Sequence, residues 1–176
     1  MSATELNGLS LTKLQELVEV VSKEPEKAEE LNKWNARVKW QGGFKSQAYV
    51  GDHAFFMDEP SNLAGVNAGP NAVQYVLSAL GGCYIVGFVL NATKRGVKVN
   101  DLEVALEGQL DNVLNFFGLS DKGHPGYREI KAKLYARTSA DRKTVEEIWK
   151  DTVATSPISN TLRRNVTVVP EISVTR

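Results

Sequence analysis

The sequence predicts a single-domain α+β fold. Short segments before and after the middle of the chain alternate apolar and polar side chains with a period of two, as half-buried strands do. Between them, a nearly continuous apolar stretch from Ala72 to Arg95 is too long for a strand and predicts a helix surrounded by protein. Turn residues such as Gln41-Gly42-Gly43 join the first strands, which is typical of a meander.

Composition limits the class of protein and its partners. A chain of 176 residues, 42% hydrophobic and 24% charged, is long enough to bury one core. Lys plus Arg equals Asp plus Glu, at 21 each, so no long-range field favours nucleic acid or an anionic membrane as a partner. The single cysteine, and the lack of a secretory pattern in residues 1–11, predict a cytoplasmic protein.

The N-terminal region predicts an amphipathic helix followed by the first strands. Apolar side chains recur at helical spacing from Leu11 to Val21, and Pro25 marks the helix end. The mixed-charge segment from Lys23 to Lys33 fits either a solvated helix or a linker. Strands are then expected at three segments, with a Gly/Pro/Asn-rich loop after them: Trp34–Trp40, Phe44–Val50 and His53–Met57, then loop Asp58–Pro70.

The central helix carries signals at both ends. Asn71 and Gln74 form a capping-box pattern before it, and Gly96 is a suitable C-terminal cap. Its most apolar part, Val76 to Leu90, is shorter than the roughly 18 to 20 residues that span a bilayer, so a core helix is expected. Three glycines within it predict close approach of another backbone: Gly81, Gly82 and Gly87.

The second half predicts three more strands and another amphipathic helix. The first of these strands has a slip in its alternation near Asn100-Asp101, which predicts a bend or bulge. The expected elements are strand Val97–Leu110, loop Asp111–Gly126, strand Tyr127–Thr138, helix Asp141–Thr155 and strand Asn165–Val174.

Four short motifs together resemble the family of osmotically inducible protein C (OsmC) and organic hydroperoxide resistance (Ohr) proteins. Asp58-Glu59-Pro60 and Gly69-Pro70-Asn71, followed by LSALGGC at residues 77–83, resemble the segment that leads into the family's cysteine-bearing helix. SPISNTL, at residues 156–162, is similar to the family's Cys-Pro-x-Ser segment. The resemblance covers residues 36–176 as an OsmC-like domain and leaves residues 1–35 as an N-terminal helical extension.

The resemblance implies an intertwined homodimer, with antiparallel strands wrapped around the long central helices and a reaction site at the subunit interface. Active members reduce organic hydroperoxides with two cysteines. The first attacks as a thiolate and becomes a sulfenic acid, and the second captures it as a disulfide. Cys83 matches the attacking position.

The sequence departs from that pattern at three positions. Ser156 stands where the family has its second cysteine, and a hydroxyl cannot form a disulfide. Val73 stands where peroxide-reducing members carry a Glu that orients an Arg. The Arg would fall within residues 41–46, where Lys45 is the one cation, and lysine offers a point charge instead of a planar fork.

The candidate catalytic residues are therefore Cys83, Lys45 and Glu59. Glu59 lies in the loop before the helix, where it is placed to orient Lys45 or Arg37 toward the sulfur. A buried thiol without a nearby cation is mostly protonated at neutral pH, and a buried free cysteine commonly acts as a small apolar core residue. Both interpretations of Cys83 stay open at this point.

The sequence contains no motif typical of a metal site or a cofactor site. His53 and His124 fit no metal-binding spacing, and no glycine-rich phosphate-binding motif is present, so neither a metal nor a cofactor is expected.

Two functions follow from the sequence. One is a stress-response thiol peroxidase with a single redox cysteine, whose partners are an organic hydroperoxide and an external thiol reductant. The alternative is a non-catalytic dimer that binds a small apolar or redox-active ligand in the interface cavity.

Overall fold

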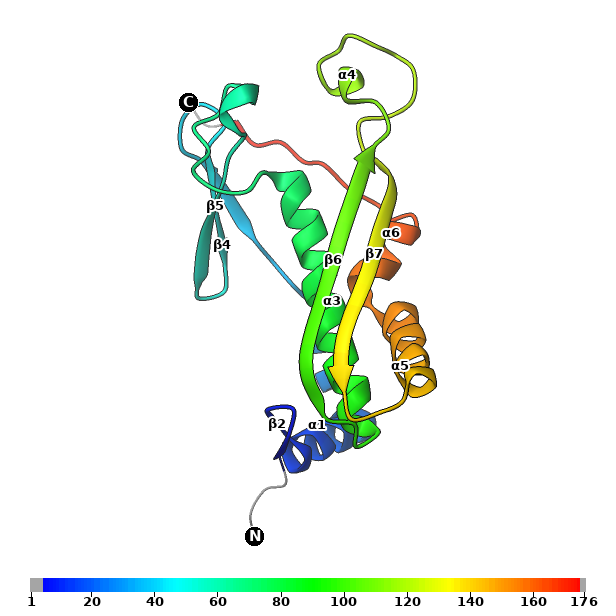
Figure 1. Ribbon diagram of the computed structural model, residues 1–176. Coiled ribbons are helices and arrows are strands. Elements are labelled where there is room, and N and C mark those ends of the chain that lie inside the picture. The colour runs from blue at the N-terminus through cyan, green and yellow to red at the C-terminus, as the bar shows by residue number, and fades with distance from the viewer. Residues whose placement is uncertain (1–4, 175–176) are drawn as a thin grey trace.

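The long helix α3 is the central element of the fold, with the β6–β7 hairpin along one side and α5 along another (Figure 1). The computed structural model describes residues 5–174 and confirms the predicted α+β class. In chain order the elements are β1 (Glu5–Leu6), β2 (Leu9–Ser10), α1 (Leu11–Lys23), α2 (Pro25–Glu30), β3 (Arg37–Trp40), β4 (Ser46–Val50), β5 (His53–Met57), η1 (Ser61–Leu63), α3 (Ala72–Lys94), β6 (Val99–Leu110), α4 (Val113–Phe116), β7 (Tyr127–Thr138), α5 (Arg142–Thr155) and α6 (Pro157–Arg163).

The strands form separate antiparallel sheets. β3, β4 and β5 make a three-stranded meander in which Val38, Ala48 and Phe55 stand opposite one another. β6 and β7 make a long hairpin whose register shifts between Val99 and Asp101, which confirms the predicted irregularity. Figure 1 shows the two sheets at different places along α3, with the meander near the start of the helix.

The signals predicted for α3 are confirmed at both ends. The Asn71 side chain accepts a hydrogen bond from the Gln74 amide, and the Gln74 side chain accepts one from the Asn71 amide. Gly96 follows the helix with a positive φ of 67°, a conformation that glycine adopts without strain.

Length alone does not exclude α3 as a membrane span. The helix has 23 residues and is long and apolar enough to cross a bilayer, so the sequence argument from the shorter run Val76–Leu90 was incomplete. Packing identifies it as a core helix. Phe88 and Ala92 are fully buried in a cluster with Val97 and with Ile148 of α5.

At two of the three glycines in α3, a side chain from another element approaches the helix closely. An added Cβ at Gly81 would lie 2.8 Å from Leu106 Cδ1, and one at Gly87 would lie 3.1 Å from Thr152 Cγ2. Gly82 faces open space in the single chain, so the predicted close approach there is not met by residues 5–174 of the same copy.

The N-terminal segment begins with a β-hairpin that the sequence analysis did not predict. Its Asn7-Gly8 turn has positive φ angles of 56° and 75°, as a two-residue type I′ turn requires. The Asn7 amide group donates to Thr93 Oγ1 and to the Val97 carbonyl, and its oxygen accepts from the Val99 amide. A single side chain thus attaches the hairpin to the end of α3 and the start of β6.

The region after α5 differs from the prediction. Residues 157–163 form the short helix α6, whose signals, Ser156 as N-cap and Pro157 at the first turn, were present in the sequence but not used. The predicted strand Asn165–Val174 is wrong for the isolated chain: this segment forms no strand. A strand needs the edge of a sheet as its partner, and alternating apolar residues alone do not supply one.

Candidate functional site

Cys83 lies in the middle of α3 on the side that faces α6. It is half-buried, and it is the one cysteine of the chain. The Ser156 hydroxyl donates a hydrogen bond to its sulfur over an Oγ–Sγ distance of 3.1 Å, although the two residues are 73 positions apart. The position that resembles the second cysteine of the family is therefore adjacent to Cys83 in space.

Ser156 is held firmly in this position. It caps the N-terminus of α6 and is only 3% exposed. Its Oγ accepts a hydrogen bond from the Ser159 amide at 3.1 Å, and its carbonyl accepts one from the Asn160 side chain at 2.9 Å. The Oγ thus accepts from the Ser159 amide and donates its proton to the Cys83 sulfur.

The hydrogen-bonded groups continue away from the sulfur. The buried Tyr84 hydroxyl donates to Ser159 Oγ at 3.1 Å, and its ring packs edge-on against Trp149 with ring centroids 5.0 Å apart. Tyr84 and Ser159 also line a cavity of about 520 Å³. Cys83 thus borders a short polar chain that leads from its sulfur to this cavity.

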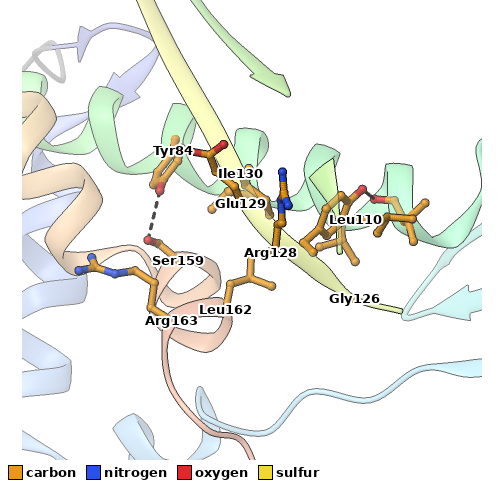
Figure 2. A pocket seen from close by; sticks show the side chains of 13 residues that line it. Tyr84, Leu110, Gly126, Arg128, Glu129, Ile130, Ser159, Leu162 and Arg163 are labelled. Carbon is orange, nitrogen blue, oxygen red and sulfur yellow. Dashed lines mark hydrogen bonds between the residues drawn. The ribbon is translucent and has the colours of Figure 1, made fainter. Parts of the chain in front are cut away.

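The cavity lies between α3, α6 and the end of the β6–β7 hairpin where residues 111–126 connect the two strands (Figure 2). In Figure 2, Arg128, Glu129 and Ile130 come from β7, and Ser159, Leu162 and Arg163 lie across from them. The remaining wall is mainly apolar and comes from Val73, Val76, Leu80, Leu110 and Tyr127, with Gly126 beside them.

The cavity wall carries an apolar residue, Val73, at the position where a charged residue was expected. At this position peroxide-reducing relatives were expected to carry a glutamate, and the valine here lines the cavity with an apolar side chain. Its carbonyl accepts a hydrogen bond from the Tyr127 hydroxyl at 2.8 Å, which joins two lining residues, one from α3 and one from β7. Cys83 itself is not part of the cavity wall.

Glu59 supports the start of α3. Its Oε2 accepts a hydrogen bond from the Asn71 side-chain amide at 3.1 Å, so it holds the residue that caps the helix. Lys45 lies before β4 with its Nζ 5.6 Å from the centroid of the Phe56 ring. No hydrogen bond or ion pair among residues 5–174 joins Glu59 or Lys45 to Cys83, and their catalytic role stays a prediction.

The two histidines lie in the loop between β6 and β7 and at the start of β5. His124 Nδ1 accepts a hydrogen bond from the Gly126 amide at 3.1 Å, and the His124 amide donates to Asp111 Oδ2 at the same distance. His124 therefore shapes the loop between β6 and β7. His53 begins β5 and is exposed. Within the described part of the chain, no three metal-ligating side chains gather at one place.

Comparison with known proteins identifies the family. The family model described as OsmC-like protein matches residues 65–171, which include α3, Cys83 and Ser156. The chain belongs to the OsmC-like protein family. No curated protein sequence gives a match.

Solved structures share the OsmC-like fold at low sequence identity. An OsmC-like protein from Mycoplasma pneumoniae is 20% identical, with a TM-score of 0.64 over 74% of this chain and 87% of that one. The organic hydroperoxide resistance protein OsmC from Legionella pneumophila is 16% identical, with a TM-score of 0.54 over 74% and 89%. OhrB of Bacillus subtilis is 19% identical, with a TM-score of 0.51 over 75% and 93%. These matches establish the fold and leave the chemistry to the residues of this chain.

Asp58 stabilises the loop that leads into the cysteine-bearing helix of this OsmC-like protein. Its place in a sequence motif gave no sign of this role. Asp58 is 3% exposed, and its carboxylate accepts three amide hydrogen bonds. The bond from the Ala68 amide contributes most to lowering the pKa of Asp58. Burial opposes this effect, while the amides of Val66 and Glu59 and the charge of Lys45 add to it.

Replacing Asp58 with Asn is expected to destabilise the protein in a pH-dependent manner. Because the pKa is lower in the folded than in the unfolded state, the carboxylate stabilises the fold above about pH 4, and the stabilisation is lost as pH falls through the lowered pKa. Urea unfolding should show Asp58→Asn to be less stable than the parent at about pH 7, with a smaller difference at about pH 3. Asp52→Asn, in the exposed turn between β4 and β5, is the control. An equal difference at both pH values would contradict the role of the charge.

Proposed function

We propose that this OsmC-like protein is a thiol-dependent organic hydroperoxide reductase with one redox cysteine, Cys83, which acts in the oxidative or osmotic stress response. The observation that carries the proposal is the 3.1 Å contact between Cys83 and the hydroxyl of Ser156, at the position of the family's second cysteine. Cys83 is also half-buried rather than fully enclosed, so a small peroxide has access to it. Structural neighbours described as organic hydroperoxide resistance proteins support the same reaction class.

The proposed reaction balances with an external thiol. The Cys83 thiolate attacks the terminal peroxide oxygen, the O–O bond breaks, and the alkoxide takes a proton and leaves as an alcohol. The sulfenic acid then reacts with one external thiol, releasing water and forming a mixed disulfide. A second external thiol attacks the external sulfur, the two external sulfurs form a disulfide, and the released Cys83 thiolate takes up the proton that the thiol lost. The peroxide gains two electrons, which the two external thiols supply. A cytoplasmic location, which we also propose, would provide such thiols.

The peroxidase proposal is tested by supplying cumene hydroperoxide and dithiothreitol to the pure protein. The parent should consume peroxide and show a transient gain of one oxygen atom on Cys83 by mass spectrometry, because sulfenic acid is the first product. Cys83→Ser should reduce peroxide consumption to the rate without protein. Absence of both consumption and mass change in the parent would exclude the proposal.

A second candidate function is ligand binding without catalysis. The cavity of about 520 Å³ falls in the range of small-molecule sites, and its largely apolar wall ends at Tyr84 and Ser159 without including the sulfur. In this case an apolar or redox-active ligand would occupy the cavity, and Cys83→Ser would bind it as well as the parent does.

We further propose that the protein is a homodimer, because a single copy leaves three apolar surfaces uncovered. On the edge strand β3, Trp40 is 76% exposed. On α3, Val86 is 69% exposed beside the open space at Gly82, which would allow another backbone to approach closely. In the unpaired segment after α6, Ile172 is 89% exposed. A second copy would cover these surfaces and offer sheet edges to the unpaired segment.

The relation of the N-terminal segment to the rest of the chain is also a proposal. We assign residues 1–35 to an extension of the OsmC-like domain at residues 36–176, because β3, the first strand of the three-stranded sheet, begins at Arg37 and the family model lies entirely after it, at residues 65–171. Asn7 makes the side-chain hydrogen bonds that attach this segment to α3 and β6.

Charge on the exposed face of α3 is expected to separate the dimer. Light scattering should give the parent twice its chain mass of 19.3 kDa, and Val86→Asp should give a single chain mass because it buries an unpaired charge in the interface. Leu119→Asp is the control, since Leu119 is similarly exposed at 73% but lies in the loop between β6 and β7. A monomeric parent, or a Val86→Asp variant that remains dimeric, would contradict this interface.

A further inference from the structure

Ser156 occupies the place of a resolving thiol, but its hydroxyl has a different chemical capacity. An alcohol oxygen cannot form a disulfide, yet it can donate one strong hydrogen bond to an anion. The role of Ser156 therefore depends on which neighbouring group accepts this hydrogen bond. This inference rests on the proposed role of Cys83 and goes beyond it by assigning a task to the serine.

The hydrogen bonds around Ser156 leave one direction for its proton. The Ser159 amide donates to the Oγ from α6 at 3.1 Å, so that side of the oxygen is an acceptor. The Asn160 side chain donates to the Ser156 carbonyl and not to the hydroxyl. Ser156 is 3% exposed, so bulk water does not compete for the proton. The remaining neighbour is Cys83 Sγ at 3.1 Å.

An independent feature shows that the hydroxyl is not merely a helix cap. The N-caps of α3 and α5, Asn71 and Asp141, accept amide hydrogen bonds from their own helices through oxygens that cannot donate. Ser156 accepts its amide in the same way and also donates across to another helix, from α6 to α3. Asparagine or aspartate would satisfy the cap, but only a hydroxyl oxygen both accepts from the amide and donates to the sulfur.

We propose that Ser156 is a positioning residue that stabilises the thiolate of Cys83, and afterwards its sulfenate, by donating a hydrogen bond to them. The serine neither gains nor loses electrons and forms no bond to sulfur. The oxidised Cys83 therefore stays available to an external thiol instead of closing an internal disulfide. In this way a serine at the resolving position converts a two-cysteine site into a one-cysteine site.

The test compares the rate of Cys83 alkylation by iodoacetamide in the intact protein and in Ser156→Ala. Only the thiolate reacts, and a hydrogen bond to a charged group is worth enough to change its population about tenfold. We expect alkylation of Ser156→Ala to be roughly threefold to tenfold slower than that of the parent at about pH 7. The deficit should vanish or reverse at about pH 10, because the hydrogen-bonded thiolate is the weaker nucleophile once protonation no longer separates the two proteins. A purely structural role would not produce this pH dependence.

Two further variants make the outcome decisive. Ser156→Thr keeps a hydroxyl and should keep the parent rate at about pH 7, which also serves if Ser156→Ala does not fold. Thr152→Val removes another fully buried hydroxyl, one that bonds the Ile148 carbonyl and not the sulfur, and should alkylate like the parent. An unchanged rate in Ser156→Ala, or a slowed rate in Ser156→Thr, would overturn the proposal. No peroxide is used, so failure of the peroxidase assay would leave this result interpretable.

Discussion

The packing of α3 against α5 and α6 is the constraint on which the rest of the structure depends. Phe88 and Ala92 of α3 pack with Ile148 of α5 in a fully buried cluster, and Gly87 lets Thr152 approach the helix backbone. Arg95 forms an ion pair with Asp151 at the end of the same interface. Since α6 follows α5 directly, this packing fixes the distance between the start of α6 and the middle of α3. The contact between Ser156 and Cys83 is a consequence.

The same helix divides the molecule into a buried side and an open side. α5, α6 and the β6–β7 hairpin cover part of α3, while the face that carries Gly82 and Val86 remains uncovered by the chain itself. The three-stranded meander likewise contributes Phe55 to a ring contact with Tyr75 of α3 but exposes its edge strand. A core helix that is apolar nearly all round and only partly covered by its own chain is suited to assembly with a second copy.

Local signals predicted most of the fold, and distant contacts account for the rest. The capping box at Asn71, the cap at Gly96 and the bulge before Asp101 depend on a few neighbouring residues, so the sequence contains enough information to place them. The Asn7-Gly8 hairpin and α6 also have local signals, an Asn-Gly pair and a Ser-Pro helix start. The missing strand after residue 165 has a different cause, because alternating side chains cannot show whether a sheet edge is available, and within residues 5–174 the segment pairs with none.

The candidate site was predictable only in part, for the same reason. Cys83 and Ser156 were connected by resemblance to a family, and no spacing within the sequence could have shown that they touch. The cavity beside Tyr84 and Ser159 was likewise invisible, since its walls come from four separate elements. The assignment of Glu59 and Lys45 to catalysis remains a prediction, since their observed contacts are with Asn71 at the start of α3 and with Phe56 of β5, respectively.

Disulfide formation in Ser156→Cys tests most directly whether residue 156, at the start of α6, is in contact with Cys83 of α3. A sulfur near the present Ser156 oxygen would need to move only about 1 Å closer to reach bonding distance from Cys83. After mild oxidation, we predict loss of both free thiols and an intramolecular disulfide between residues 83 and 156 in peptide mass mapping. Two free thiols, or only disulfides between chains, would show that α3 and α6 do not meet as described.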